Sequence, residues 1–173
     1  MVLAATARDR LIGVALNDIG PEIAQTGLDI IMNYIGRRPA QKTYAEAAAF
    51  RAKNWMHFKD VPMDRWLAEV AAHYIETPYG LTLRYDPKLR DAVIAAGAQP
   101  APDLWPLFDA LHGLPLALIR GANSDLLSVA TADEMANRRP DMIRTDVPGR
   151  GHVPFLDEPQ ALAALHTWLE RLH

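Results

Sequence analysis

The chain has 173 residues, of which 50% are hydrophobic and 23% are charged, with a formal net charge of −3 and no cysteine. This composition predicts one globular domain with a small insertion at most, and it excludes a disulfide framework, a thiolate metal site and a cysteine nucleophile. No basic stripe suggests a nucleic-acid partner, and no apolar run reaches the ~18 residues of a membrane span. We therefore expect a cytoplasmic protein that binds neither nucleic acid nor membrane.

The first 22 residues predict a helix end, a strand and a turn. Residues 1–7 are apolar and have no capping residue before them, so we expect a chain that starts in the middle of a fold. Residues 11–16 form a nearly continuous apolar run, which is typical of a parallel strand buried on both faces. The strand is followed by Asn17 and Asp18 and then by a turn at residues 19–22, where Gly20 and Pro21 break the pattern.

Residues 23–111 are predicted to be mostly helical. A crossover between parallel strands needs only about a dozen residues, so the excess predicts an inserted helical cap. Trp55, Trp66 and Trp105 fall in this cap. They are either ordinary core aromatics or the lining of a pocket for a small apolar substrate.

After the cap, strands and helices alternate again. An apolar run predicts a strand at 114–120, and a second short strand is predicted at 142–147; helices are predicted after them, at 127–139 and 157–172. The predicted fold class is α/β, with a short parallel sheet of about three strands, flanking helices and the inserted cap. The core would comprise residues 1–22 and 112–173, and the cap residues 23–111.

Two side chains suggest a catalytic site. Asp125 follows strand 114–120, and His152 follows strand 142–147 in a loop with Gly149 and Gly151. Loops at the carboxyl ends of neighbouring parallel strands lie side by side, so we expect Asp125 and His152 to meet. A carboxylate that orients an imidazole is two thirds of a hydrolytic triad. Asp18 is the alternative acid, because it also follows a strand; otherwise it braces the entry to the cap.

The third member of a triad is missing from the sequence. The only serines are Ser124 and Ser128, and neither stands in a G-x-S-x-G elbow between a strand and a helix. Ser124 directly precedes the acid, and Ser128 suits the start of the following helix. The sequence therefore predicts an acid and a base with no nucleophile to activate.

Four segments together resemble a known family: residues 16–22, 103–107, 120–128 and 149–154. The chain resembles the C-terminal part of an α/β-hydrolase with a helical cap. The resemblance implies a triad acid at Asp125 and a triad base at His152. It also implies a nucleophile, usually serine, in an elbow just before the helix that residues 1–7 resemble. That elbow and the loops of the oxyanion hole are absent, so we expect the chain to be inactive alone.

The resemblance implies a parent enzyme that hydrolyses an ester or similar bond of a small apolar substrate, with no cofactor or metal. The chain would then be a truncated fragment or one half of a split hydrolase. A non-catalytic ligand-binding module is the alternative from another class, and no G-x-G-x-x-G supports a nucleotide-binding protein. Strand 11–16 would have lost a neighbour, which predicts self-association through its exposed edge.

Overall fold

The computed structural model describes residues 1–97 and 102–172. The chain divides into two units, Met1–Gly27 with Pro102–His173, and Leu28–Ala101. The predicted boundaries were 22/23 and 111/112, so the first unit takes in more of the sequence than expected. One consequence is that Trp105 belongs to the first unit and not to the inserted segment.

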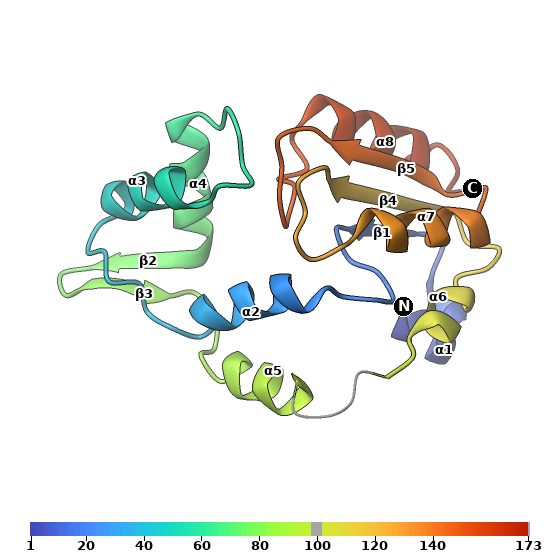
Figure 1. Ribbon diagram of the computed structural model, residues 1–173, viewed down its shortest axis with the longest axis horizontal. Helices are drawn as coiled ribbons and strands as arrows, with labels where there is room; N and C mark the ends of the chain where they lie inside the picture. The colour runs from blue at the N-terminus through green and yellow to red at the C-terminus, as the bar shows by residue number, and fades with distance from the viewer. Residues whose placement is uncertain (98–101, 173) are drawn as a thin grey trace. The chain divides into compact units, whose positions relative to one another are not determined.

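A three-stranded parallel sheet organises the first unit (Figure 1). The strands are β1 (Val14–Asn17), β4 (Leu116–Gly121) and β5 (Ile143–Val147), in the order β1-β4-β5. Every residue of the central strand β4 is buried, which explains its uninterrupted apolar run. The predicted α/β class with three parallel strands is confirmed, and all three strands point their carboxyl ends to the same edge.

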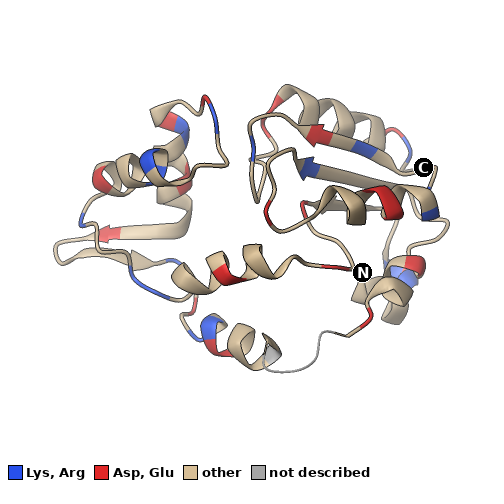
Figure 2. Ribbon diagram, in the orientation of Figure 1, with Lys and Arg blue, Asp and Glu red and all other residues tan. Residues whose placement is uncertain are grey.

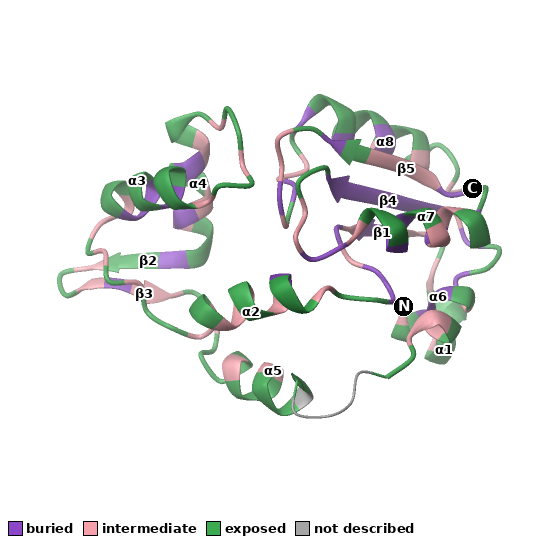
Figure 3. Cartoon of the chain, in the orientation of Figure 1, coloured by how far each residue is buried: buried purple, intermediate pink, exposed green. Residues whose placement is uncertain are grey.

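Helices cover both faces of this sheet, and the central strand β4 is buried along its length (Figure 3). Successive residues of a strand point to opposite faces, so β4 contributes to both cores. Leu116 and Leu118 share a core with side chains of α1 (Val2–Thr6), α6 (Trp105–Asp109) and α7 (Val129–Arg138). Ala117 and Ile119 pack against α8 (Pro159–Leu169) on the other face. A short 3-10 helix, η1 (Arg8–Arg10), connects α1 to β1.

Strand β1 has one hydrogen-bonded neighbour in the described part of the chain, which is β4. The strand is shorter than the predicted span of 11–16. Ile12, just before it, is 73% exposed. Self-association through this edge stays a prediction.

The second unit contains helices and one hairpin. The helices are α2 (Gln25–Tyr34, which starts in the first unit), α3 (Tyr44–Asn54), α4 (Met63–His73) and α5 (Leu89–Gly97). An antiparallel pair, β2 (Tyr74–Thr77) and β3 (Gly80–Leu83), interrupts them. The mostly helical prediction missed this hairpin, although Gly80 at φ 105° and Thr77 next to Pro78 are turn chemistry.

Aromatic side chains form the interior of the second unit. Trp66 stacks on Trp55 with ring centroids 5.7 Å apart, and Phe58 meets Trp66 edge-on at 5.6 Å. The guanidinium of Arg51 lies 4.3 Å from the Trp55 ring centroid. In the part of the chain that the structure describes, no helix is long and apolar enough to cross a lipid bilayer.

Candidate active site

Asp18 ends strand β1 in a tight turn at the carboxyl edge of the sheet. Its φ is 52° and its side chain is fully buried. Its main-chain N–H continues the ladder to the carbonyl of Ile119 at 2.7 Å. The N–H of Gly121 then donates to Oδ1 of Asp18 at 2.9 Å, so the carboxylate takes the place of a ladder carbonyl. The strand end therefore fixes one oxygen of this acid.

His152 is presented by the loop that follows β5. This loop lies directly against β4, because a Cβ on Gly121 would stand 2.6 Å from the carbonyl oxygen of Arg150. The N–H of Asn123 donates to the same carbonyl at 2.9 Å. Gly149 takes a left-handed φ of 67°, which lets the chain turn after the strand. The predicted approach of the loops after β4 and β5 is thus observed.

The imidazole of His152 meets Asp18. Its Nδ1 lies 2.8 Å from Oδ2 of Asp18, and its side chain is 21% exposed. A carboxylate accepts, so the shared proton sits on Nδ1 in the neutral ring, and Nε2 becomes the nitrogen that accepts. This is the geometry that a carboxylate gives to a catalytic base.

The sequence favoured Asp125 for this place, and the structure puts Asp18 there. The imidazole has a single Nδ1, and the partner of that nitrogen is the carboxylate of Asp18. Asp125 lies further along the loop after β4, where its main-chain carbonyl accepts from Oγ1 of Thr26 at 3.3 Å. The alternative acid therefore has the contact that the sequence assigned to the preferred one.

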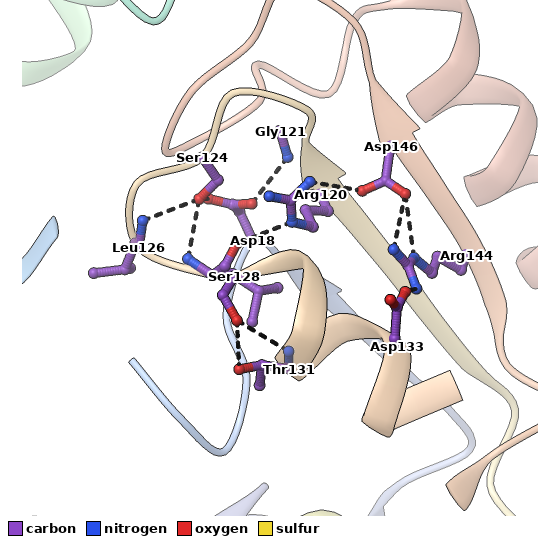
Figure 4. Close-up of polar contacts among 11 residues, drawn as sticks. Asp18, Arg120, Gly121, Ser124, Leu126, Ser128, Thr131, Asp133, Arg144 and Asp146 are labelled. Carbon is purple, nitrogen blue, oxygen red and sulfur yellow. Dashed lines mark hydrogen bonds and ion pairs between the residues drawn. The ribbon is translucent and has the colours of Figure 1, made fainter. Parts of the chain in front are cut away.

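The sequence predicted no role for Ser124, whereas the structure shows that its side chain contacts Asp18. Its hydroxyl donates to Oδ2 of Asp18 at 2.6 Å, and its Oγ accepts from the N–H groups of Leu126 at 3.2 Å and Leu127 at 3.0 Å (Figure 4). Ser128 caps α7, as expected, by accepting from the N–H of Thr131 at 3.0 Å. Neither serine is placed as a nucleophile.

Two arginines link strand β4, strand β5 and helix α7 next to the site. Arg120 donates to the Leu127 carbonyl at 2.9 Å and to Asp146 at 3.0 Å, which joins β4 to β5. Arg144 pairs with Asp146 at 3.1 Å and with Asp133 of α7 at 2.7 Å (Figure 4). Figure 2 shows basic and acidic positions on β5 and acidic positions on α7. Burial works against the charge of Arg144, but Asp133 and Asp146 together raise its pKa. These pairs hold the loop after β4 in position.

Glu158 supports the histidine loop from the other side. It is 6% exposed and accepts from Nε of Arg150 at 2.7 Å and from the N–H groups of Phe155 at 3.1 Å and Leu156 at 3.0 Å. Asn17, at the end of β1, donates to the Pro154 carbonyl at 3.1 Å. The segment on both sides of His152 is therefore anchored by side chains.

The three tryptophans predicted to bind substrate lie in different units. Trp105 donates from Nε1 to Glu22 at 2.8 Å, and Arg138 covers its ring at 4.1 Å. Trp55 and Trp66 belong to the aromatic interior of the second unit. A common substrate pocket for the three stays a prediction. No group of three or more metal-binding side chains gathers among the described residues.

No protein-family model matches the sequence. The chain is 31% identical over 172 residues to a 3-hydroxybutyrate-oligomer hydrolase of Cupriavidus necator, and the match covers 94% of this chain and 58% of the relative. An α/β hydrolase of Novosphingobium aromaticivorans superposes with a TM-score of 0.85 at 36% identity, over 98% of this chain and 60% of that one.

A third comparison supports the fold alone. A hydrolase structure from Rickettsia typhi, described as putative, has a TM-score of 0.79 at 20% identity, and the match covers 98% of this chain and 57% of that one. The chain spans about three fifths of the length of these relatives.

Proposed function

The chain has a partial α/β-hydrolase fold, consistent with the C-terminal portion of that fold, and from this premise we propose that Asp18 and His152 are the acid and base of an ester hydrolase. The observation that carries the proposal is the 2.8 Å contact between Nδ1 of His152 and Oδ2 of Asp18 at the carboxyl edge of the sheet. In α/β proteins this edge is where sites are built.

The pair would work as follows. Asp18 holds the proton on Nδ1, so Nε2 of His152 takes the proton of a nucleophilic hydroxyl as its oxygen bonds to the ester carbonyl carbon. The protonated imidazole then gives that proton to the departing alkoxide. Water then gives a proton to Nε2 as its oxygen bonds to the acyl carbon. The bond from that carbon to the nucleophile's oxygen breaks, and Nε2 returns the proton to that oxygen, which releases the carboxylic acid product. Asp18 remains ionised throughout and stabilises the imidazolium.

The nucleophile of this proposal comes from outside the 173 residues. The sequence contains no G-x-S-x-G elbow, and Ser124 and Ser128 are engaged with Asp18 and α7. The oxyanion-hole amides would accompany the nucleophile. The chain thus supplies the proton-transfer half of the chemistry.

For the substrate, we propose an ester of a short hydroxy acid. The support is the 31% identity with the Cupriavidus protein, whose name gives 3-hydroxybutyrate oligomers as its substrate. Such an oligomer is a chain of small acyl units joined by ester bonds. The sequence predicts an ester or similar bond of a small apolar substrate; this proposal narrows the bond to an ester and replaces the apolar substrate with a hydroxy-acid oligomer.

The test is a chimera. The part of the Novosphingobium hydrolase that this chain does not cover would be fused before Met1, or co-expressed with the chain. Hydrolysis of p-nitrophenyl butyrate and of 3-hydroxybutyrate trimer would be measured. We expect His152→Gln and Asp18→Asn to lower kcat about 1,000-fold or more. Asp125→Asn is the matched control and should retain kcat within about threefold, since Asp18 occupies the place beside Nδ1.

Two results would contradict the proposal. One is a folded chimera whose ester hydrolysis is indifferent to His152→Gln. The other is a loss with Asp125→Asn that equals the loss with Asp18→Asn. The first would reject the base and the second would reject the choice of acid.

A further inference from the structure

We propose that Ser124 is a positioning residue, which locks the Asp18 carboxylate in the orientation that His152 requires. The inference rests on the proposed function in taking Asp18 and His152 as acid and base. It assigns a role to a side chain that lies outside the triad. The acid would then be assembled by two loops, with the carboxylate from the end of β1 and its lock from the loop after β4.

The direction of the hydroxyl proton follows from the neighbours of Ser124. Two main-chain N–H groups, those of Leu126 and Leu127, donate to Oγ at 3.2 and 3.0 Å. Oγ therefore acts as the acceptor in both bonds, and its single proton remains for Oδ2 of Asp18 at 2.6 Å. A hydroxyl held in this way cannot rotate to a second acceptor without losing its contact with the carboxylate.

Three donors fix the plane of the carboxylate. The amide of Gly121 holds Oδ1, while Ser124 and His152 share Oδ2. With Ser124 removed, each oxygen keeps one donor, and the carboxylate gains freedom to turn about its last torsion. The imidazole, which takes its ring orientation from Oδ2, would turn with it.

The charges around Asp18 suit this role. The nearest guanidinium on β4, that of Arg120, is committed to the Leu127 carbonyl and to Asp146. The donors to Asp18 in the described residues are an amide, a hydroxyl and the imidazole. Asp18 is thus kept as the counter-charge for an imidazolium, and Ser124 orients it without adding a competing positive charge.

The first experiment uses the 173-residue chain and needs no activity. Nitrogen-15 NMR of the imidazole reports which ring nitrogen of His152 carries the proton, and the exchange of the Nδ1 proton with water reports the strength of its contact. We expect Ser124→Ala to speed that exchange about tenfold and to mix the tautomers, because a bond to a charged acceptor is lost. Ser124→Thr keeps the hydroxyl and should restore the wild-type signals.

Ser128→Ala is the matched control, since Ser128 also accepts a main-chain N–H near the start of α7 but does not touch Asp18. The proposal is overturned if Ser124→Ala leaves exchange and tautomer unchanged, or if Ser128→Ala alters them equally. Should Ser124→Ala not fold, Ser124→Cys decides. Its weak S–H donor should give exchange faster than wild type, and wild-type exchange would overturn the proposal.

The chimera supplies a second readout. There, Ser124→Ala should lower kcat about 10- to 100-fold with little change in KM, because the base is misoriented while substrate contacts remain. A change of that size in KM, with kcat unchanged, would contradict a positioning role for Ser124. If the wild-type chimera shows no hydrolysis that depends on His152, the proposed function fails, whereas the NMR comparison still tests the lock on its own.

Discussion

The two units of the chain are stabilised by different kinds of interior, and in the first unit the interior adjoins the polar contacts at the sheet edge. In the first unit, a fully buried strand carries aliphatic side chains to both faces, and the loops after three strands meet around Asp18. In the second unit, the stacked indoles of Trp55 and Trp66 fill the centre, together with the Arg51 guanidinium, which lies over the rings of Trp55 and Tyr74. The first unit therefore places side chains on a rigid sheet edge, while the second encloses an aromatic cluster on short helices and a hairpin.

The two interiors fix the positions of their side chains in different ways. A carboxylate held by ladder hydrogen bonds is located by the backbone of two strands, as Asp18 is. An indole held by stacking is located by its neighbours' shapes, which tolerate small shifts. We expect variants in the second unit to change stability without altering the His152 contact, and variants at the sheet edge to change both.

The largest expected effect is in the second unit. Trp66 is 4% exposed and touches two aromatic rings. Trp66→Ala should lower the free energy of unfolding of this unit by about 4 kcal/mol, through lost burial and the cavity left behind. Denaturant unfolding, with hydrogen exchange to separate the units, measures it. Leu67→Ala, at a side chain that is 37% exposed, is the control and should cost about 1 kcal/mol or less.

The state of the sheet edge in that variant decides whether the units are independent. We expect the Nδ1 proton of His152 to exchange at its wild-type rate in Trp66→Ala. Faster exchange would show that the aromatic interior and the sheet edge unfold together.

The second effect breaks the sheet edge itself. A Cβ on Gly121 would meet main-chain oxygens of the histidine loop, those of Gly151 and, at 2.6 Å, of Arg150. Gly121→Ala should therefore lower the free energy of unfolding of the first unit by about 3 kcal/mol and displace His152 from Asp18. Unfolding curves and the Nδ1 proton signal measure both.

Gly97→Ala is the counterpart in the second unit. Among the described residues, no atom lies within 4 Å of a Cβ built there, at the end of α5. It should stabilise the helix by up to about 1 kcal/mol. If Gly121→Ala were equally harmless, the close approach of the two loops would be refuted.

Much of the first unit could be predicted from its sequence. Residues 114–120 are an apolar run that breaks at Gly121, and residues 142–147 are the second short segment that the sequence predicts as a strand; both spans contain strands in the structure. The alternation of strands and helices also implies the parallel order. The sequence did not predict the hairpin at 74–83, because its strands have only four residues each and the segments on both sides have helical spacing.

The sequence predicts that a histidine meets a carboxylate at this edge of the sheet, but it does not show which carboxylate. A histidine in a loop with two glycines after a strand predicted that His152 lies beside a carboxylate, and the structure shows that contact; its role as a base stays a prediction. Asp18 and Asp125 both follow strands, so spacing could not separate them. What separates them is the hydrogen bond from the main-chain N–H of Gly121 to the Asp18 carboxylate and the left-handed φ of Asp18, which exist only in the folded sheet.

A smaller effect is expected where a buried charge holds the histidine loop. Glu158→Gln keeps the shape but weakens the bonds from Arg150, Phe155 and Leu156, and should cost about 2 kcal/mol. Thermal unfolding measures the cost. Glu170→Gln, at the exposed end of α8, should change the melting temperature little. A cost at Glu170 equal to that at Glu158 would show that the loss of a negative charge, and not the loss of the loop contacts, causes the destabilisation.

The smallest effect depends on pH and belongs to the first unit alone. Arg139 is 3% exposed, spans the carbonyls of Leu111 and Leu114, and donates to both oxygens of Asp141. Its hydrogen bonds hold the pKa of Asp141 below the ordinary value of 3.8. A pKa lowered by folding means that the stabilisation is complete above 3.8 and is lost as the pH falls through the lowered value.

Asp141→Asn should therefore cost stability at pH 7 and cost progressively less below pH 3.8. The Asp141 side chain is 59% exposed, so solvent screening limits the cost to about 0.5 kcal/mol. The measurement is the difference in free energy of unfolding between wild type and variant from pH 7 to pH 2. A difference that does not change with pH would mean that the variant acts through packing at the end of α7. Hydrogen exchange at α3 and α4 should stay the same in both proteins, because Arg139 and Asp141 belong to the first unit and α3 and α4 to the second.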